Sequence, residues 1–406
     1  MSFRPGGYFR LTADAGAIPA LDGLRGIAIL MVVLYHVTES FVSEQQPLLR
    51  LAGWDVATPL LNGWMGVQLF FVLSGFLITH HLLRRFRTDR GPELGRYLVK
   101  RWLRIAPTYY VILAIVALGL VPYYEVEPGR MGARVIYHAL FLQDYLPSSL
   151  LGPFWSLGVE EKFYLAAPLI AFLLVSVRRP GAAMLALLLL GCIPLASRIA
   201  MTAGVIPAPE EGGFTRIWRN PFHLSMDALI VGCAVAWLSI RREAFGALAT
   251  PRAAKGIFLT GVAGVAALLA IPSAAVHGTL FDRVALFPLV AVAFGCVLAG
   301  VVLAPCPARA LESRWLARAG RVAYPWYLTH VLVMWAAWGS LNAAWPALSR
   351  LPGAVQFALF LPAYLATSAA AALLLHFAVE KPCLLLKDGI DRPHPAPRLD
   401  LRTESA

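Results

Sequence analysis

Long apolar stretches recur along the chain and are separated by short polar segments. A helix needs about 20 consecutive apolar residues to cross the hydrocarbon core of a bilayer. Ten stretches have about that length, and they predict spans near 22–42, 63–83, 106–124, 155–177, 181–203, 221–240, 256–272, 284–304, 322–342 and 357–378. The pattern therefore predicts an all-α fold, a polytopic membrane helical bundle of about ten transmembrane helices.

Composition supports the same class of protein. Of the 406 residues, 59% are hydrophobic and only 14% are charged, which is far more apolar than a soluble domain. We expect one transmembrane domain over 22–380. A cytoplasmic segment, 1–21, should precede it, and a polar, proline-containing tail, 381–406, should follow it in the cytoplasm without a fixed structure.

The basic residues indicate how the chain is threaded through the membrane. Lys and Arg fall mainly in alternate loops, for example in 84–104 and 241–255. Because basic loops stay in the cytoplasm, this alternation predicts that both termini are cytoplasmic. The net charge of +12 does not indicate nucleic-acid binding, since no basic block joins aromatic stacking residues in a soluble module. The five cysteines show no disulfide or metal-ligand spacing, so no metal site is expected.

The first apolar segment contains two polar side chains on one face. Arg25 and His36 are eleven residues apart, so in a helix they share a face and lie about 16 Å apart along the axis. Each costs several kcal/mol in hydrocarbon unless it has a partner. We therefore expect both to face the protein interior and to serve a function.

Polar residues of five different spans also fall at a similar depth. Each is five or six residues from the predicted outer end of its span, or roughly 8–9 Å below the surface. These residues are His36, Gln68, Glu160, Arg198 and Asp227. The depth predicts one outward-opening polar cavity, although Glu160 could instead form a structural salt bridge.

A second polar cluster is predicted on the inner side. The string RYLVKRWLRIAPTYY brings Arg101 and Arg104 to the start of the third span, at the level of Arg25. One interpretation is contact with phospholipid headgroups. The other is a site for a phosphorylated cytoplasmic ligand, which would give two half-sites on opposite sides of the membrane.

Seven strings, in order over about 20–380, resemble motifs of the membrane acyltransferase 3 family. They are ALDGLRGIAILMVVLYH, GWMGVQLFFVLSGFLI, RYLVKRWLRIAP, FWSLGVEEKFYLAAP, SMDALIVGCAVA, AYPWYLTHVLV and VEKP. The resemblance implies a multi-pass protein of the bacterial cytoplasmic (inner) membrane that transfers an acyl group, most often acetyl. The donor would be acyl-coenzyme A (acyl-CoA), a co-substrate rather than a permanently bound cofactor. The acceptor would be a hydroxyl of a carbohydrate, such as a surface polysaccharide, glycolipid or glycoside.

The resemblance also implies roles for individual residues. It makes Arg25 and His36 an essential pair and Glu160 the functional acid, and it matches Arg101, Arg104, Tyr327 and His330 to further motif positions. Two positions depart from the family pattern: Gln68, where an acidic residue is common, and Lys162, where glutamine is frequent.

These residues suggest a mechanism as a hypothesis. Arg101, Arg104 and Arg25 would hold the phosphates of acyl-CoA. His36 would act as a general base on the acceptor hydroxyl or as a nucleophile that carries the acyl group. Glu160 or Asp227 would orient its imidazole.

Other polar residues are expected to contact the substrates. They are Asp227, Gln68, Arg198, Tyr327 and His330. For Ser74, in LSGFL, close helix packing is favoured over a nucleophilic role.

A secondary transporter is the alternative class of function. Ten spans and buried charges suit one, but transporters often contain a two-fold internal repeat. The strings LSGFL, WSLGVEEKFY and YPWYLTH each occur once. A structural scaffold for glycan assembly would not need the histidine.

Overall fold

A computed structural model describes residues 8–9, 11, 18–42, 47–87, 93–126, 129–146, 150–207, 217–304 and 309–390. Its long helices are α2 (Pro19–Phe41), α4 (Met65–Phe86), α5 (Leu94–Ala117), α7 (Trp155–Ser176), α8 (Pro180–Thr202), α10 (Phe222–Ile240), α11 (Pro251–Leu269), α13 (Leu286–Leu303), α15 (Ala323–Ala344) and α16 (Gly353–Leu375). Shorter helices are α3 (Thr58–Leu61), α6 (Met131–Ala139), α12 (Ser273–Val276), α14 (Arg314–Arg321) and α17 (Lys381–Gly389). Single turns of 3-10 or π helix are η1 (Gly152–Phe154), η2 (Phe281–Ala285), η3 (Arg309–Glu312), η4 (Pro346–Arg350) and η5 (His376–Glu380). Strands β1 (Arg50–Leu51) and β2 (Trp54–Asp55) form one small hairpin.

The structure confirms an all-α, polytopic fold, because a long helix overlaps each of the ten predicted segments. Among the described residues, seven helices are long and apolar enough to cross a membrane. The other three are α5, α7 and α15. Charged residues interrupt the apolar sequence of α5 and α7, and polar and aromatic residues are frequent in α15. The side of the membrane on which the termini lie stays a prediction.

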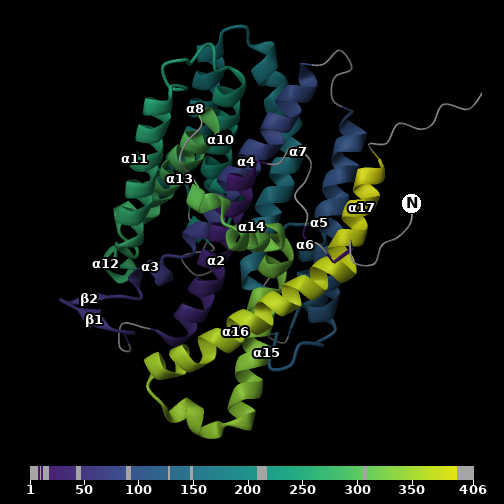
Figure 1. The fold of residues 1–406 in the computed structure, drawn as a ribbon, viewed down its shortest axis with the longest axis vertical. Helices are drawn as coiled ribbons and strands as arrows, with labels where there is room; N and C mark the ends of the chain where they lie inside the picture. The colour runs from purple at the N-terminus through teal and green to yellow at the C-terminus, as the bar shows by residue number, and fades with distance from the viewer. Residues whose placement is uncertain are drawn as a thin grey trace, which may run out of the picture.

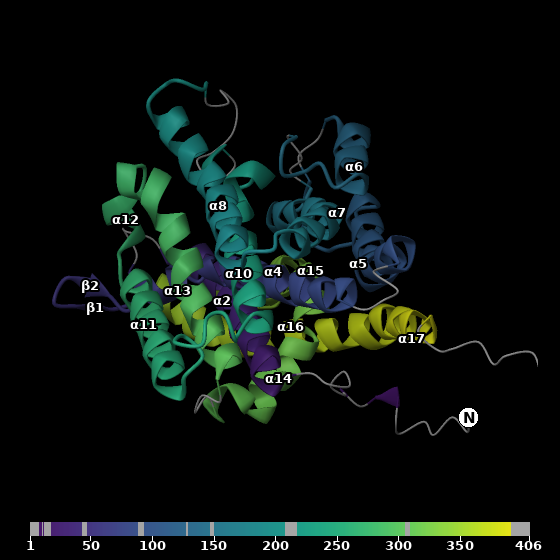
Figure 2. The same ribbon diagram turned by 90° about the horizontal axis from the view of Figure 1, so that it is seen from above.

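The long helices form two groups (Figures 1 and 2). In one group, α4, α7, α8, α10 and α13 share a hydrophobic core, and α11 packs on α13. In the other, α2, α5, α15 and α16 share a second core. The groups meet where α2 packs against α4. Polar residues from both groups can therefore face one another at this junction.

Glycines allow two helix pairs to approach to backbone contact. A Cβ at Gly320 of α14 would lie 1.9 Å from the carbonyl oxygen of Asp22 in α2, and one at Gly26 of α2 would lie 2.2 Å from that of Leu316. A Cβ at Gly75 of α4 would lie 2.0 Å from the carbonyl oxygen of Leu229 in α10. Side chains at these positions would force the helices apart, as is typical of small residues in membrane-helix contacts.

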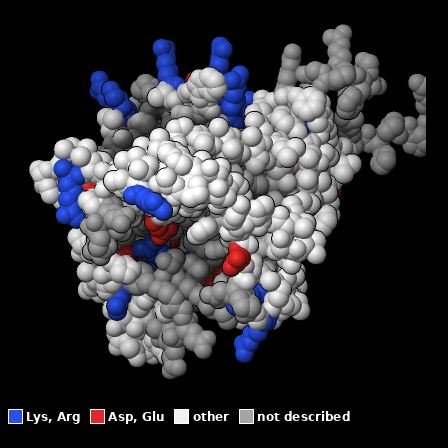
Figure 3. All heavy atoms as spheres, turned by 90° about the horizontal axis from the view of Figure 1, so that it is seen from below, with Lys and Arg blue, Asp and Glu red and all other residues white. Residues whose placement is uncertain are grey.

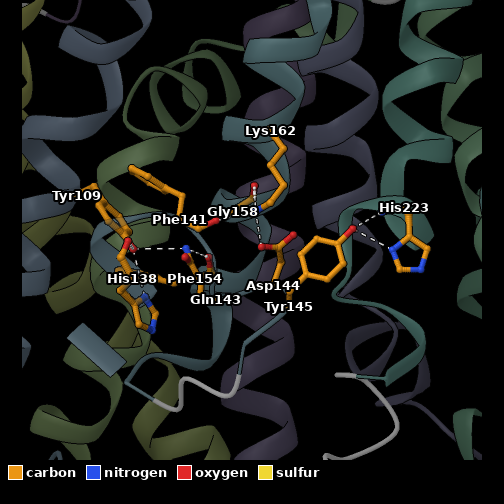
Figure 4. Close-up of polar contacts among 10 residues, drawn as sticks. All are labelled: Tyr109, His138, Phe141, Gln143, Asp144, Tyr145, Phe154, Gly158, Lys162 and His223. Carbon is orange, nitrogen blue, oxygen red and sulfur yellow. Dashed lines mark hydrogen bonds and ion pairs between the residues drawn. The ribbon is translucent and has the colours of Figure 1, made fainter. Parts of the chain in front are cut away.

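Hydrogen bonds connect α5, the end of α6 and the segment that leads into α7. Figure 4 shows these polar contacts. The hydroxyl of Tyr109 in α5 donates to the carbonyl oxygen of His138 at 2.9 Å and lies 3.2 Å from its Nδ1 atom. Gln143 donates to the carbonyl oxygen of Phe154 at 2.9 Å. These bonds fix the residues that lead into α7.

Lys162 of α7 ties the same segment from the other side (Figure 4). Its ammonium group donates to Asp144 and to the carbonyl oxygen of Phe141, both at 2.6 Å. Tyr145 then contacts Nδ1 of His223 in α10 at 2.9 Å. Lys162, one of the two departures from the family pattern, is thus paired with an acidic loop residue.

The C-terminal helix extends beyond the boundary expected at residue 380. After α16 the chain passes through the π turn η5 directly into α17, which ends at Gly389. His376 and Glu380 form a buried pair in that turn, with Nδ1 and Oε2 2.6 Å apart. The unstructured tail was predicted over 381–406. Its first residues form α17, and residues 391–406 lie outside the described part of the chain.

Replacing Gly75 by alanine should destabilise the protein, because the added methyl group cannot fit against the backbone of α10. We expect a loss of about 1–3 kcal/mol, seen as a lower thermal unfolding midpoint in detergent. Gly256→Ala in α11 is the matched control, because nothing lies within 4 Å of its added Cβ. Equal midpoints for the two variants would contradict the close packing of α4 on α10.

The stability should also depend on the protonation of His138. Burial lowers the pKa of His138 from 6.5 to about 4. Between these values the unfolded chain binds a proton that the folded protein does not, so acidification through this window should cost about 3 kcal/mol. The thermal unfolding midpoint should fall between about pH 7 and pH 4, and this fall should be smaller for His138→Gln than for the unchanged protein. The same decrease in both would exclude this contribution.

Candidate active site

A pocket lies at the junction of the two helix groups. Its cavity volume is ≈ 120 Å³. Its charged lining residues are Arg25, Arg101, Arg104, Arg321 and Glu160. The structure therefore brings together the three arginines that the sequence assigned to the inner half-site.

Helix α5 carries two of these arginines deep into the protein. It begins at Leu94, twelve residues before the span predicted from 106, so the basic block lies within the helix. Arg104 is therefore about 15 Å along the helix from its N-terminal end. The guanidinium of Arg101 lies 5.7 Å from the ring centroids of Tyr97 and Tyr164, a distance typical of cation–π contacts.

Asp22 joins the other two arginines. Its carboxylate accepts from Arg25 at 3.3 Å and from Arg321 at 3.2 Å. The pair comes from helices α2 and α14, which Gly26 and Gly320 allow to approach closely. One buried carboxylate thus holds two guanidinium groups at the wall of the pocket.

Glu160 lies in this pocket, which corrects its predicted grouping with an outer cluster. Its carboxylate accepts from the hydroxyl of Ser74 at 2.5 Å and from that of Tyr164 at 3.3 Å. The prediction placed Glu160 by counting residues from the outer end of its span, and so assumed that α7 begins at the outer surface. However, Ser156, its second residue, lies 2.6 Å from the hydroxyl of Tyr327, the fifth residue of α15. Since α15 is predicted to start on the inner side, α7 begins well inside the bundle.

Tyr327 forms one end of the pocket, and two histidines lie beyond it. Its hydroxyl donates to the carbonyl oxygen of Pro153 at 2.5 Å, and its ring centroid is 5.6 Å from that of His330. His330 in turn lies 5.1 Å from His36, measured between ring centroids. The predicted residues Tyr327, His330 and His36 therefore form a continuous row away from the arginines.

The acidic group beside His36 is Glu39, not Glu160 or Asp227 as predicted. Its Oε2 atom lies 3.8 Å from Nδ1 of His36. The side chain of Glu39 is 56% exposed and that of His36 is 23% exposed. The imidazole is thus half-buried beside a solvent-exposed carboxylate. The spacing of three residues on one helix face could have identified Glu39 from the sequence.

The remaining predicted residues do not line this pocket. Arg198 donates to Asp227 from both terminal nitrogens at 3.0 Å, and both side chains are buried. This ion pair satisfies both charges between α8 and α10, away from the arginine pocket. Gln68 is also buried, and its Oε1 atom has no hydrogen-bond partner among the described residues. Of the five residues assigned to one outer cavity, Glu160 lines the arginine pocket and the other four do not, and Arg198 stays paired with Asp227.

A further polar group lies near the end of α2 that carries His36. Arg219 donates to Asp282 at 3.2 Å and lies 4.3 Å from the ring centroid of Trp64. It is also within electrostatic range of Glu39. Figure 3 views the molecule from below and shows acidic and basic atoms together in a hollow of this mostly uncharged face. The sequence did not indicate this group.

Several residues of the pocket were not predicted as site residues. Ser74 was assigned to helix packing, and Tyr164 was not assigned. Asp22, which pairs with two of the lining arginines, was not assigned either. Arg321 was counted only as a basic loop residue, and it meets Asp22 across nearly 300 positions of sequence. No group of three His, Cys, Asp or Glu residues within the described ranges is placed to hold a metal ion.

Known proteins resemble this chain over most of its length. The profile of a family described as "Acyltransferase domain" matches residues 18–377. A peptidoglycan O-acetyltransferase OatA of Listeria monocytogenes is 29% identical over 235 residues, which cover 54% of this chain and 34% of the relative. A putative peptidoglycan O-acetyltransferase YrhL of Bacillus subtilis is 28% identical over 54% of this chain and 33% of the relative. An O-acetyltransferase OatA of Staphylococcus aureus is 24% identical over 54% and 34%, respectively.

The matching part of the chain spans about a third of the length of these curated relatives. No solved structure matches it significantly. The profile match nevertheless covers nearly all of the helical domain, and the apolar helices are those of an integral membrane protein. The chain belongs to the membrane acyltransferase 3 family.

Proposed function

We propose that this protein is an O-acyltransferase of a bacterial cytoplasmic membrane. It moves an acyl group, acetyl above all, from acyl-CoA to a hydroxyl of a carbohydrate acceptor. The observation that carries this proposal is the row that leads from four arginines, past Tyr327, to His330 and His36. The names of the relatives, peptidoglycan O-acetyltransferases, support acetyl as the group and a glycan polymer as the acceptor.

The arginines suit the phosphates of the donor. A guanidinium group binds phosphate oxygens through two parallel N–H groups, and such charge-assisted bonds are stronger than neutral ones. Arg101, Arg104, Arg25 and Arg321 line one pocket whose only charged counterpart in the lining is Glu160. The resulting positive charge favours an anionic ligand over a neutral one.

The distance along α2 suits the arm of coenzyme A. Eleven residues separate Arg25 from His36, which corresponds to about 16 Å of helix. With its phosphates at the arginines, the donor extends its thioester past Tyr327 toward His36. The separation also means that Arg25 and His36 act on different parts of the substrate.

His36 then has the position of the reacting base. It takes the proton of the acceptor hydroxyl while the oxygen attacks the thioester carbonyl, and the C–S bond breaks to release the thiolate. Alternatively, its nitrogen accepts the acyl group first and passes it to the hydroxyl. In either route Glu39, beside Nδ1, stabilises the charged ring.

Arg104→Ala should weaken the binding of acetyl-CoA. The loss of one charge-assisted contact with a phosphate should raise Kd about tenfold or more. The measurement is titration of the purified protein in detergent with acetyl-CoA. Arg96→Ala is the matched control, since Arg96 lies on the same helix, is exposed and pairs with Glu93 at 3.1 Å. An unchanged Kd for Arg104→Ala would mean that the arginines of α5 only orient the chain in the membrane and do not bind the donor.

His36→Ala should abolish acetyl transfer without loss of donor binding. The loss of a general base typically lowers the rate 10²- to 10⁴-fold, roughly. Labelled acetyl-CoA and cell-wall glycan fragments would serve as substrates, with His81→Ala, at the exposed end of α4, as the control. Full activity of His36→Ala would refute its role. Movement of the glycan across the membrane without label transfer would support the transporter alternative.

A further inference from the structure

His330 is held rigidly in the centre of the second helix group. It lies on α15, is fully buried, and its Nδ1 atom is 2.7 Å from the carbonyl oxygen of Tyr327 one turn earlier. The hydroxyl of Tyr364 in α16 donates to the carbonyl oxygen of His330 at 3.3 Å. Ring orientation and backbone position are therefore both fixed.

The partner of Nδ1 determines the tautomer of His330. A carbonyl oxygen only accepts hydrogen bonds, so Nδ1 must carry the hydrogen. In the neutral ring, Nε2 is then the acceptor with a free lone pair. This Nε2 atom is buried and has no hydrogen-bond partner among the described residues.

A buried acceptor without a partner is uncommon in proteins, because it has lost its contact with water without replacement. Helix packing does not require it, since an amide or an apolar side chain could fill the space. The neighbouring titratable ring is His36, with its centroid 5.1 Å away and its plane inclined by 40°. His330 therefore has an unpaired acceptor in a ring that neighbours His36, the residue that takes the proton in the proposed acyl transfer.

We propose that His330 is a positioning residue that shares the reaction proton with His36. This inference rests on the proposed acyl transfer. When the acceptor oxygen bonds to the acyl carbon, its proton moves to His36, and the lone pair of His330 Nε2 accepts a hydrogen bond from the charged ring. The C–S bond breaks, and the proton leaves the pair to the thiolate of coenzyme A, which restores both neutral rings.

Two side chains, Glu39 and His330, contact the ring of His36 from different helical positions. Glu39 faces Nδ1 from the solvent side of the same helix, at 3.8 Å. His330 faces the ring from α15, on the buried side. The imidazolium formed during the reaction carries two N–H groups. Glu39 accepts from the one at Nδ1, and His330 shares the other with the reacting oxygen and then with the thiolate that takes the proton.

Two amide substitutions distinguish the role of Nδ1 from that of Nε2 in His330. The amide nitrogen of asparagine in His330→Asn can replace Nδ1 and keep the bond to Tyr327, but nothing replaces Nε2. The amide oxygen of glutamine in His330→Gln can replace the acceptor at Nε2, but the bond to Tyr327 is lost. Thermal unfolding midpoints of both variants in detergent report on the structural role alone.

Steady-state acetyl transfer from acetyl-CoA to cell-wall glycan fragments tests the proposal. We expect His330→Asn to lower kcat roughly tenfold to a hundredfold with an unchanged KM for acetyl-CoA. His330→Gln should recover most of this loss although it is the less stable variant. Greater activity of His330→Asn than of His330→Gln, or equal activity of both, would overturn the proposal. Failure of the unchanged protein to transfer acetyl would instead refute the proposed function.

Discussion

The cost of placing charge inside an apolar bundle is the constraint on which the rest of this structure depends. Four arginines and a glutamate line one pocket among membrane helices, and each would cost several kcal/mol without compensation. The fold provides that compensation locally. Asp22 lies between Arg25 and Arg321, tyrosine rings lie beside Arg101, and two hydroxyls donate to Glu160. The compensation is incomplete in charge, since the arginines outnumber the acids, and this surplus is what makes the pocket suitable for an anion.

The position of the pocket follows from how the two helix groups meet. Helices α2 and α4 form the junction, and glycines at 26, 75 and 320 bring α14 and α10 against them at backbone distance. Such contacts provide van der Waals packing where the hydrophobic effect contributes little between helices. Because α14 approaches so closely, Arg321 reaches a carboxylate at the far end of the chain. The same fold places Tyr327 in the arginine-lined pocket, with His330 beside it and His36 beside His330.

The inner part of the site could be predicted because its signals are local. Arg25 and His36 share a helix face by spacing, and the basic block of α5 is a single continuous string. The outer part could not be predicted correctly. Counting residues from the outer end of each span assumed that every helix begins at the membrane surface. Helix α7 begins inside the bundle, held by Tyr327, Lys162 and the segment before it, and so Glu160 lies among the arginines. Arg198 and Asp227 neutralise each other.

The sequence by itself determined the class of fold, the ten long helices, the shared face of Arg25 and His36, and the family. These follow from periodicity, apolar length and ordered motifs, which are properties of neighbouring residues. Only the tertiary structure decided which polar groups meet: Ser74 with Glu160, Asp22 with two arginines, and His330 with His36. The physical reason is that such contacts depend on where each helix starts and on how closely helices approach. Helix starts and helix separations are set by packing between segments that are distant in the sequence, so no local sequence pattern predicts them.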